Sequence, residues 1–569
     1  MKISIAKTAG FCMGVRRAVD MVLDAANLSD EPIYTYGPLI HNPQVLEMLE
    51  GKNIHRLDTI PKTGRGVVLI RAHGVPPKDE KALSDAGFTV INATCPRVVR
   101  VQVIINKFAK KGYATIIVGD KKHPEVVGLL GYARDQGHTI TRLEQLATLP
   151  IFEKAVVVAQ TTQNTGFYDE IKAWCSTHAP HYEIFDTICG STEKRQDEVR
   201  KLARSHDAVI VVGGKQSGNT KRLAQVARET GTLATHIEDA CDIEYSFLSH
   251  AKSIAITAGA STPNWIIKET CYGVDQAMQQ QQPVKAALFR TLNFLLQTNV
   301  LLAAGAGCLT FGAAAIQGGD RTMIHAVIAM AYVLSMQIMN NIITIGADTY
   351  NRPYRAAFYK KHHVILKLLA LMSGGLGLYL AWTLGPLCFA ILMAMSLLGF
   401  SYNRNIIPLW IKSRVHRIKD IPGSKTILIA VAWGVVTSLL PALTGRVPVA
   451  LAVIAFFFST GLVFARTVFV DVLAIQGDRI SGKETLPILL GAKKSFAYIQ
   501  GTLGATALLP VAGFFAAPWG NAMFFLALVP LFMLVLLKLY KEDSFLSVSP
   551  YEVLFESSFV MTGLVALML

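Results

Sequence analysis

Acidic side chains are scarce in the second half of this 569-residue chain. Residues 282–569 carry 10 Asp and Glu against 22 Lys and Arg, whereas residues 1–281 carry 30 against 33. A basic surplus confined to the more apolar half argues against nucleic-acid binding and favours a membrane protein with basic cytoplasmic loops. Charged residues make up only 17% of the chain and hydrophobic ones 51%, which excludes intrinsic disorder.

The N-terminus lacks a continuous apolar stretch, so no secretory signal peptide is expected. The eight cysteines also lack the close spacing of a CxxC motif, and six of them lie in residues 1–281. Without an export signal, structural disulfides are not expected, and metal or redox roles become the better hypothesis.

A glutamine-rich segment, QAMQQQQPVK, separates the two halves. Polar low-complexity sequence of this kind is typical of linkers between domains. We therefore expect a soluble domain over residues 1–275, a linker over 276–285 and a membrane domain over 286–569.

The soluble half alternates buried strand patterns with helical patterns. The strings GVVLIRAHG, YATIIVGD, AVVVAQTT, DAVIVVGG and KSIAITAG each end an apolar run in small or polar residues. This alternation predicts α/β units with parallel strands, whose chemistry gathers beyond the carboxyl ends of the strands.

Three cysteines stand in loops at long intervals: Cys12 in GFCMG, Cys95 in NATCPR and Cys189 in DTICGS. We interpret them as one cysteine from each of three α/β modules, meeting at a shared centre. Three thiolates with one open position suit an iron–sulfur cluster. Spacing alone fits small core residues as well.

Other polar residues also follow apolar runs. Histidines 41, 73 and 123 each stand in a loop rich in Pro or Gly, and Glu125 follows two residues after His123. Imidazoles, hydroxyls and amides in one pocket suit a diphosphate, and a buried carboxyl group could relay protons. The hydroxyl- and Gly-rich turns supply Thr161, Ser217, Gly218, Asn219 and Ser261.

From Ile3 to about Asp275 the chain resembles the 4-hydroxy-3-methylbut-2-enyl diphosphate reductase (IspH/LytB) family. The resemblance rests on strings that occur in the order of the family: GFCMGVRRAV, YGPLIHNPQV, IRAHGV, NATCP, GDKKHPEVVG, AQTTQ, DTICGSTEKRQ, VVGGKQSGNT and TAGASTP. The resemblance implies a pseudo-threefold α/β trefoil that holds a [4Fe–4S] cluster on Cys12, Cys95 and Cys189. It implies substrate binding by His41, His73, His123, Thr161, Ser217, Asn219 and Ser261, and proton delivery by Glu125. Gly218 departs from the family pattern, which often has a second Ser there. The backbone N–H of Gly218 remains available.

The second half contains nine apolar segments of bilayer length, at about 288–316, 323–346, 363–383, 385–402, 425–444, 447–474, 493–516, 520–540 and 551–569. With the soluble domain in the cytoplasm, the loops on that side carry 16 Lys and Arg, and the opposite loops carry only Arg321 and Arg446. This asymmetry predicts a multi-pass protein of the cytoplasmic membrane.

Carboxylates at the ends of two of these segments suggest a second site. Asp348, Asp471 and Asp478, beside Arg352 and Lys483, could hold Mg²⁺ and a diphosphate, or merely cap helices at the interface.

The stretches around Asp348 and around Asp471 and Asp478 resemble the UbiA family of intramembrane prenyltransferases. The resemblance implies an all-α bundle of nine helices with two Asp-rich loops. In the first motif, N-x3-D-x3-D, this chain has Asn340, Thr344 and Asp348, so Thr replaces one Asp. In the second, Ala474 stands between Asp471 and Asp478 where the family has another Asp.

Two functions remain for the whole chain. The first is a fused enzyme in which a reductase makes C5 diphosphates and a membrane transferase attaches a prenyl group to an aromatic or lipid acceptor. The second is a reductase whose membrane half is a non-catalytic anchor or lipid-binding module. The resemblance implies prenyl diphosphate substrates and reduced ferredoxin or flavodoxin as electron donor, with the lipid bilayer as surroundings and no nucleic acid.

Overall fold

The computed structural model describes residues 2–29, 31–244, 251–279, 283–319, 323–402, 423–445, 447–483, 485–516, 521–542 and 548–568. The chain divides into two compact units, Met1–Gln281 and Gln282–Leu569. Most of the expected linker is helical, because α11 (Asn264–Gln279) reaches into it and α12 (Pro283–Gln297) begins within it. Residues 280–282 of the linker lie outside the described residues, as do the basic loop 403–422, Arg321 and Arg446.

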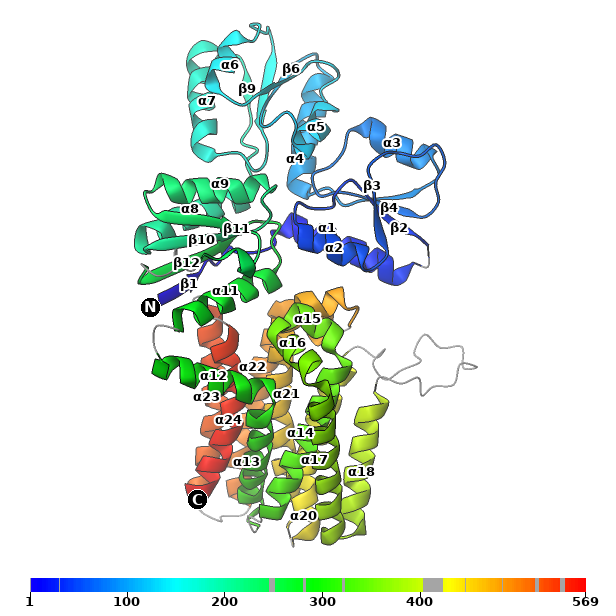
Figure 1. Ribbon diagram of the computed structural model, residues 1–569, viewed down its shortest axis with the longest axis vertical. Helices are drawn as coiled ribbons and strands as arrows, with labels where there is room; N and C mark the ends of the chain where they lie inside the picture. Colours follow the sequence, from blue (N-terminus) through cyan, green and yellow to red (C-terminus); the bar gives the residue numbers. More distant parts are fainter. Residues whose placement is uncertain are drawn as a thin grey trace. The chain divides into compact units, whose positions relative to one another are not determined.

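Three separate sheets build the first unit (Figure 1). Each sheet has four parallel strands, and all three share one strand order. The orders are β3-β2-β4-β5, β7-β6-β8-β9 and β11-β10-β12-β1, so the N-terminal strand takes the fourth place in the last sheet. The strands are β1 (Lys2–Ile5), β2 (Ile33–Tyr36), β3 (Ile54–Leu57), β4 (Val67–Ile70), β5 (Thr89–Asn92), β6 (Ala114–Val118), β7 (Gly137–Ile140), β8 (Ala155–Ala159), β9 (Glu183–Ile184), β10 (Ala208–Val212), β11 (Leu233–Ile237) and β12 (Ser253–Ala258). The predicted three-module α/β fold is therefore confirmed.

The five apolar runs of the sequence form the central strands β4, β6, β8, β10 and β12. Every residue of β4, β6, β8 and β10 is buried, as a parallel strand covered on both faces requires. Each sheet has its own core, centred for example on Val68, Val157 and Val209. The unit is thus three small modules rather than one large sheet.

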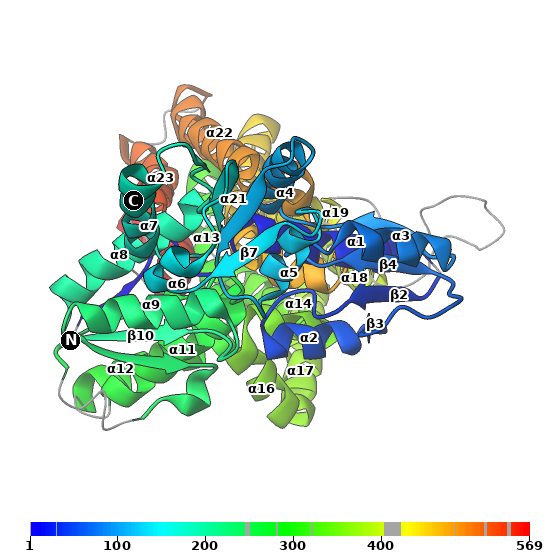
Figure 2. The ribbon, with the colours of Figure 1, turned by 90° about the horizontal axis from the view of Figure 1, so that it is seen from above.

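Helices connect the strands and cover the sheets. They are α1 (Met13–Leu28), α2 (Pro43–Glu50), α3 (Pro77–Asp85), α4 (Pro96–Ala109), α5 (Pro124–Leu130), α6 (Leu143–Thr148), α7 (Thr165–His178), α8 (Gly190–Ser205), α9 (Gly218–Glu229) and the 3₁₀ turn η1 (Ala240–Asp242). In the third sheet, α8 and α9 lie on one face and α11 on the other (Figures 1 and 2).

The second unit is a helical bundle. Its elements are α12, α13 (Val300–Gln317), α14 (Met323–Ile343), α15 (Ile345–Asn351), α16 (Pro353–Lys361), α17 (His363–Leu384), α18 (Pro386–Ser401), α19 (Ser424–Gly434), the π-helical turn η3 (Val435–Leu439), α20 (Leu440–Thr444), α21 (Val449–Ile480), α22 (Leu486–Ala516), the 3₁₀ helix η4 (Asn521–Ala527), α23 (Leu528–Glu542) and α24 (Val548–Met568).

Eight helical spans among the described residues are long and apolar enough to cross a membrane, and α18 is a shorter apolar helix. Together they correspond to the nine predicted segments. The first segment begins later than expected, because Asn299 adopts a left-handed conformation (φ 60°) that separates α12 from α13. Helix α22 begins at Leu486 and is interrupted at Gly491, whose φ is 78°.

Candidate active site and a second cavity

Each of the three cysteines lies at a joint between modules. Cys12 follows β1, Cys95 follows β5 and Cys189 follows β9, the fourth-place strands of the three sheets. Each is the N-cap residue of the helix that leads onward, α1, α4 or α8. Because the N-terminus of a helix favours negative charge, this position stabilises a thiolate.

Close packing brings the first two cysteines together. A Cβ atom placed on Gly14 would lie 2.4 Å from the Sγ atom of Cys95, so only glycine leaves room for this thiol beside α1. All eight cysteines are free, and burial raises the pKa of Cys95, with a smaller contribution from the neighbouring thiols of Cys12 and Cys189. A cationic partner such as a metal centre would favour the thiolate form of Cys95.

The polar residues also occupy repeated positions. His41, His123 and Ser217 each stand five residues after the first strand of their module, β2, β6 or β10. His73 and Ser261 stand three residues after the third strands β4 and β12, and Thr161 stands two residues after β8. The parallel sheets therefore deliver equivalent loops to one centre, and the loops differ in the polar group that they carry.

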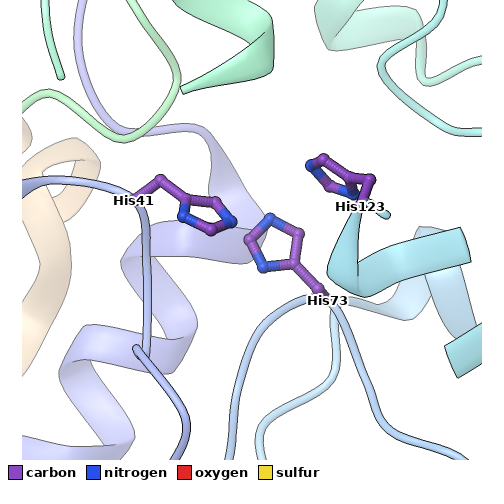
Figure 3. A group of neighbouring side chains, drawn as sticks. All are labelled: His41, His73 and His123. Atoms are coloured by element: carbon purple, nitrogen blue, oxygen red, sulfur yellow. The ribbon is translucent and has the colours of Figure 1, made fainter. Parts of the chain in front are cut away.

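The three imidazoles face one another (Figure 3). Their ring centroids are 5.0, 5.2 and 5.8 Å apart, and one nitrogen from each ring lies within 4.8 Å of the others. Burial lowers the pKa of all three rings, to about 4 for His123 and well below the usual value for His73. Lowered pKa values favour neutral imidazoles, and a bound anion would raise these pKa values and favour uptake of a proton. Three such nitrogens could also ligate a transition metal ion.

The other polar groups around the histidines distinguish between these ligands. Among the described residues, His73 Nδ1 and Asn219 Nδ2 are buried and have no hydrogen-bond partner. Nearby, the Ser261 hydroxyl donates to the His41 carbonyl oxygen (3.1 Å) and lies 3.4 Å from the Ser217 hydroxyl. Amide and hydroxyl groups add little to a metal site but suit the several oxygens of a phosphate group.

Glu125 is fully buried beside this cluster. Its carboxylate accepts hydrogen bonds from the backbone N–H of Thr161 (2.7 Å) and from the Thr161 hydroxyl (2.9 Å). Burial raises the pKa of Glu125 to about 7, although both hydrogen bonds from Thr161 act to lower it. A carboxyl group that titrates near neutral pH is suited to proton transfer.

One cavity of about 760 Å³ brings these residues together. Its lining includes every residue that the sequence singled out in this half: Cys12, His41, His73, Cys95, His123, Glu125, Thr161, Cys189, Ser217, Gly218, Asn219 and Ser261. A Cβ atom on Gly218 would meet nothing closer than the His123 ring at 4.0 Å, so space does not enforce this glycine.

Sequence reasoning missed Arg195. Its buried guanidinium donates to the carbonyl oxygens of Gly10 (2.7 Å) and Ala258 (3.1 Å), fixing the loop that carries Cys12. Interaction with Cys12 and Cys189 acts to raise the pKa of Arg195, and burial lowers it overall. The string DTICGSTEKRQ contains this arginine on the helix that Cys189 begins, which is the signal that could have found it.

The bundle contains a second, polar cavity of about 590 Å³. The structure brings to its lining all six residues singled out in this half: Asn340, Asp348, Arg352, Asp471, Asp478 and Lys483. Thr344 and Ala474, the replacements in the two motifs, lie in the same lining. Sequence reasoning missed Arg355, Lys425 and Arg466, which also line the cavity. Arg466 lies on α21 with Asp471 and Asp478, whereas Arg355 and Lys425 lie on α16 and α19.

An apolar cavity of about 800 Å³ continues from the polar one. The two share Gln337, Asn340, Lys425 and Ile429, and the apolar part is lined by side chains such as Tyr332, Met395 and Trp433. A polar compartment that opens into an apolar one fits an amphipathic molecule with a charged head and a hydrocarbon tail.

The fold and site of the first unit define an α/β protein of three modules that brings three lone cysteines and three histidines to one cavity. Residues 3–275 match the LytB protein family. A 4-hydroxy-3-methylbut-2-enyl diphosphate reductase from Geobacter sulfurreducens is 41% identical over 269 residues, which cover 47% of this chain and 95% of that protein. The chain belongs to the LytB family.

Solved structures resemble both units. A structure of (E)-4-hydroxy-3-methyl-but-2-enyl diphosphate reductase is 38% identical and covers 48% of this chain and 99% of its own, with a TM-score of 0.39. Residues 300–546 match the UbiA prenyltransferase family. A UbiA homolog from Aeropyrum pernix is 15% identical and covers 48% of this chain and 99% of its own, with a TM-score of 0.37.

Proposed function

We propose that the first unit catalyses the reductive dehydroxylation of (E)-4-hydroxy-3-methylbut-2-enyl diphosphate to isopentenyl and dimethylallyl diphosphate. The observation that carries this proposal is one cavity lined by three lone cysteines, a histidine trio and a buried carboxyl group. The relatives named above supply the substrate. Each turnover consumes two electrons and two protons, breaks the allylic C–O bond and releases water.

The three cysteines fit an iron–sulfur cluster. They are free, they line one cavity, and each begins a helix whose N-terminus favours thiolate. We propose a [4Fe–4S] cluster on Cys12, Cys95 and Cys189. When bound, it supplies electrons and a Lewis-acidic iron that weakens the bond to the leaving oxygen.

The remaining residues bind the substrate and move a proton. The three imidazoles surround the diphosphate together with Ser217, Asn219 and Ser261. The imidazoles gain positive charge as the diphosphate enters. The N–H of Gly218 adds a donor at the start of α9. Glu125 donates a proton to the departing hydroxyl group, and Thr161 holds its carboxyl group in place.

Anaerobic purification of the full chain tests this function. With a chemical one-electron reductant, the protein should convert the hydroxylated C5 diphosphate to both isomeric products, and Cys95→Ser should lose both cluster absorption and turnover. A wild-type protein that carries the cluster but leaves this substrate unchanged would refute the proposal.

For the second unit we propose prenyl transfer from a prenyl diphosphate to an aromatic or lipid acceptor. The joined polar and apolar cavities support it, since they match a diphosphate head and a prenyl tail. Magnesium at Asp348, Asp471 and Asp478 stays a prediction from the resemblance. Transfer assays with labelled prenyl diphosphates and a panel of acceptors test this function, and no transfer under any condition would favour the anchor.

We propose further that the protein is a multi-pass protein of the cytoplasmic membrane with the reductase unit in the cytoplasm. The distribution of Lys and Arg between the loops supports this orientation. In the cytoplasm, reduced ferredoxin or flavodoxin would supply the electrons. Labelling of exposed Cys241 by an impermeant thiol reagent in intact cells would contradict this orientation.

A further inference from the structure

The carboxylates of the polar cavity in the bundle already have protein partners. Asp348 forms an ion pair with Arg355 (2.8 Å). Asp478 accepts a hydrogen bond from Asn351 (2.9 Å) and lies 3.6 Å from the Lys483 ammonium group. Asp471 accepts a hydrogen bond from the Thr426 hydroxyl (3.0 Å). All three side chains are buried.

The same cavity is a poor magnesium site. Mg²⁺ demands an octahedron of oxygen ligands and is usually bound by carboxylates together with phosphate oxygens. Thr344 and Ala474 offer a neutral hydroxyl group and a methyl group where the two motifs would carry carboxylates. A metal ion would also have to displace Arg355 and Lys483 from the carboxylates that remain. The residues present therefore do not fit the metal.

Cationic side chains of the cavity, in contrast, keep N–H groups that no acceptor among the described residues uses. Five basic and three acidic side chains line the cavity, and two of the basic ones, Arg352 and Arg466, pair with Glu552 and Glu556. Within the described part of the chain, the Nε atoms of Arg355 and Arg466 are buried without an acceptor. A buried N–H group without an acceptor is costly, and an anionic oxygen removes that cost.

Lys425 occupies the boundary between the two cavities, in the first turn of α19. None of the hydrogen bonds or ion pairs found among the described residues involves its ammonium group. A diphosphate whose tail lies in the apolar cavity would place its head at this boundary.

We propose that the polar cavity binds the diphosphate of a prenyl diphosphate directly through Arg355, Lys425 and Arg466, without Mg²⁺. The inference rests on the proposed function of the second unit, namely that it binds prenyl diphosphates. It adds that arginine and lysine take the place of the metal. Before the ligand enters, Asp348 and Asp478 already have cationic partners in Arg355 and Lys483, and only Asp471 has a neutral partner, the Thr426 hydroxyl group.

Binding of radiolabelled geranylgeranyl diphosphate to the full chain in lipid nanodiscs tests this proposal. The affinity in EDTA should equal that in millimolar MgCl₂ within about twofold. An affinity at least tenfold higher with MgCl₂ would overturn metal-free binding and leave the proposed function intact. No saturable binding under either condition would overturn both.

Variants make the test specific. Lys425→Gln should weaken binding about tenfold with or without MgCl₂, because one charged hydrogen bond is lost. Lys360→Gln, an exposed lysine of α16 outside the cavity, should bind like the wild type. The double variant Thr344→Asp with Ala474→Asp should acquire dependence on MgCl₂. Unchanged binding by Lys425→Gln would overturn the assignment of this lysine and with it the proposed direct contact.

Discussion

At Glu125, burial and hydrogen bonding act in opposite directions. Burial prevails and raises the pKa to about 7, so the protonated form predominates below pH 7 and the carboxylate above it. If Glu125 is the proton donor, turnover should decline as the pH rises through 7. Glu125→Gln should lower turnover by about 100- to 10,000-fold and remove this decline.

The glutamine variant is a clean test because it preserves the local contacts. The Gln carbonyl can accept from the Thr161 N–H, and its amide can donate to the Thr161 hydroxyl oxygen. The cluster spectrum should therefore be unchanged. A variant with wild-type turnover and an unchanged pH profile would remove Glu125 from the mechanism.

A substitution at Gly218 is expected to strengthen substrate binding. Because its Cβ position is open, Gly218→Ser should fold normally and place a hydroxyl group in the cavity beside His123. One added hydrogen bond to a charged diphosphate should lower KM by about three- to tenfold with little change in kcat. Steady-state kinetics check this expectation. An unchanged KM would show that the hydroxyl group does not reach the diphosphate, and a raised KM would show that it obstructs binding.

A candidate site residue could be predicted from the sequence where a polar side chain directly follows an apolar strand pattern. Histidines 41, 73 and 123 are of this kind, since their loops follow strongly apolar runs. Arg195 was not, because it acts from the second turn of a helix on carbonyl groups that are 63 and 185 residues away. Such a contact depends on how a helix faces its sheet, which local sequence does not specify.

At the scale of elements, the close approach of α1 and α4 depends on Gly14. Gly14→Ala should push the thiol of Cys95 away, because the new methyl group would lie 2.4 Å from its Sγ atom. The variant should lose most of its iron while remaining folded. Gly190→Ala is the matched control, since this glycine directly follows Cys189 and has nothing within 4 Å of its Cβ position.

Iron and acid-labile sulfide per chain, together with the visible spectrum, measure the outcome. Equal iron content in the two variants would mean that the contact between Gly14 and Cys95 does not control the cluster site.

Element boundaries in the bundle were only partly predictable, for a physical reason. Hydropathy reports where apolar side chains begin and end, and it placed all nine segments. It is insensitive to backbone dihedral angles, so the break at Asn299 and the interruption at Gly491 escaped it. Likewise, Arg355 and Arg466 lie outside the motifs, seven residues after Asp348 and five residues before Asp471, and hydropathy does not indicate that they face the cavity.

For the whole molecule, the number of membrane crossings depends on whether the short helix α18 spans the membrane. Its 16 residues span about 24 Å at 1.5 Å per residue, slightly less than the ~30 Å hydrocarbon core. We expect α18 to cross the membrane. If it did not, the basic loop before α17 and the basic loop after α18 would lie on opposite sides of the membrane. Nine crossings that start from the proposed cytoplasmic side would place the end of α24 on the opposite side of the membrane.

A periplasmic reporter enzyme fused after Leu569 should therefore be active, and the same reporter fused before Met1 should be inactive. Activity from the N-terminal fusion, or none from the C-terminal one, would mean that α18 does not cross or that the orientation is reversed.

With the proposed cluster on all three cysteines, their position at the joints between modules would link iron supply to folding. A cluster held by all three would close two long loops, Cys12 to Cys95 and Cys95 to Cys189, of 83 and 94 residues. In the chain-entropy estimate for a cross-link, a loop of this size is worth about 4–5 kcal/mol. Each module has its own core, so a chain deprived of iron would keep three folded lobes that lose their mutual anchoring. Iron starvation would then act on the lifetime of the protein as well as on its turnover.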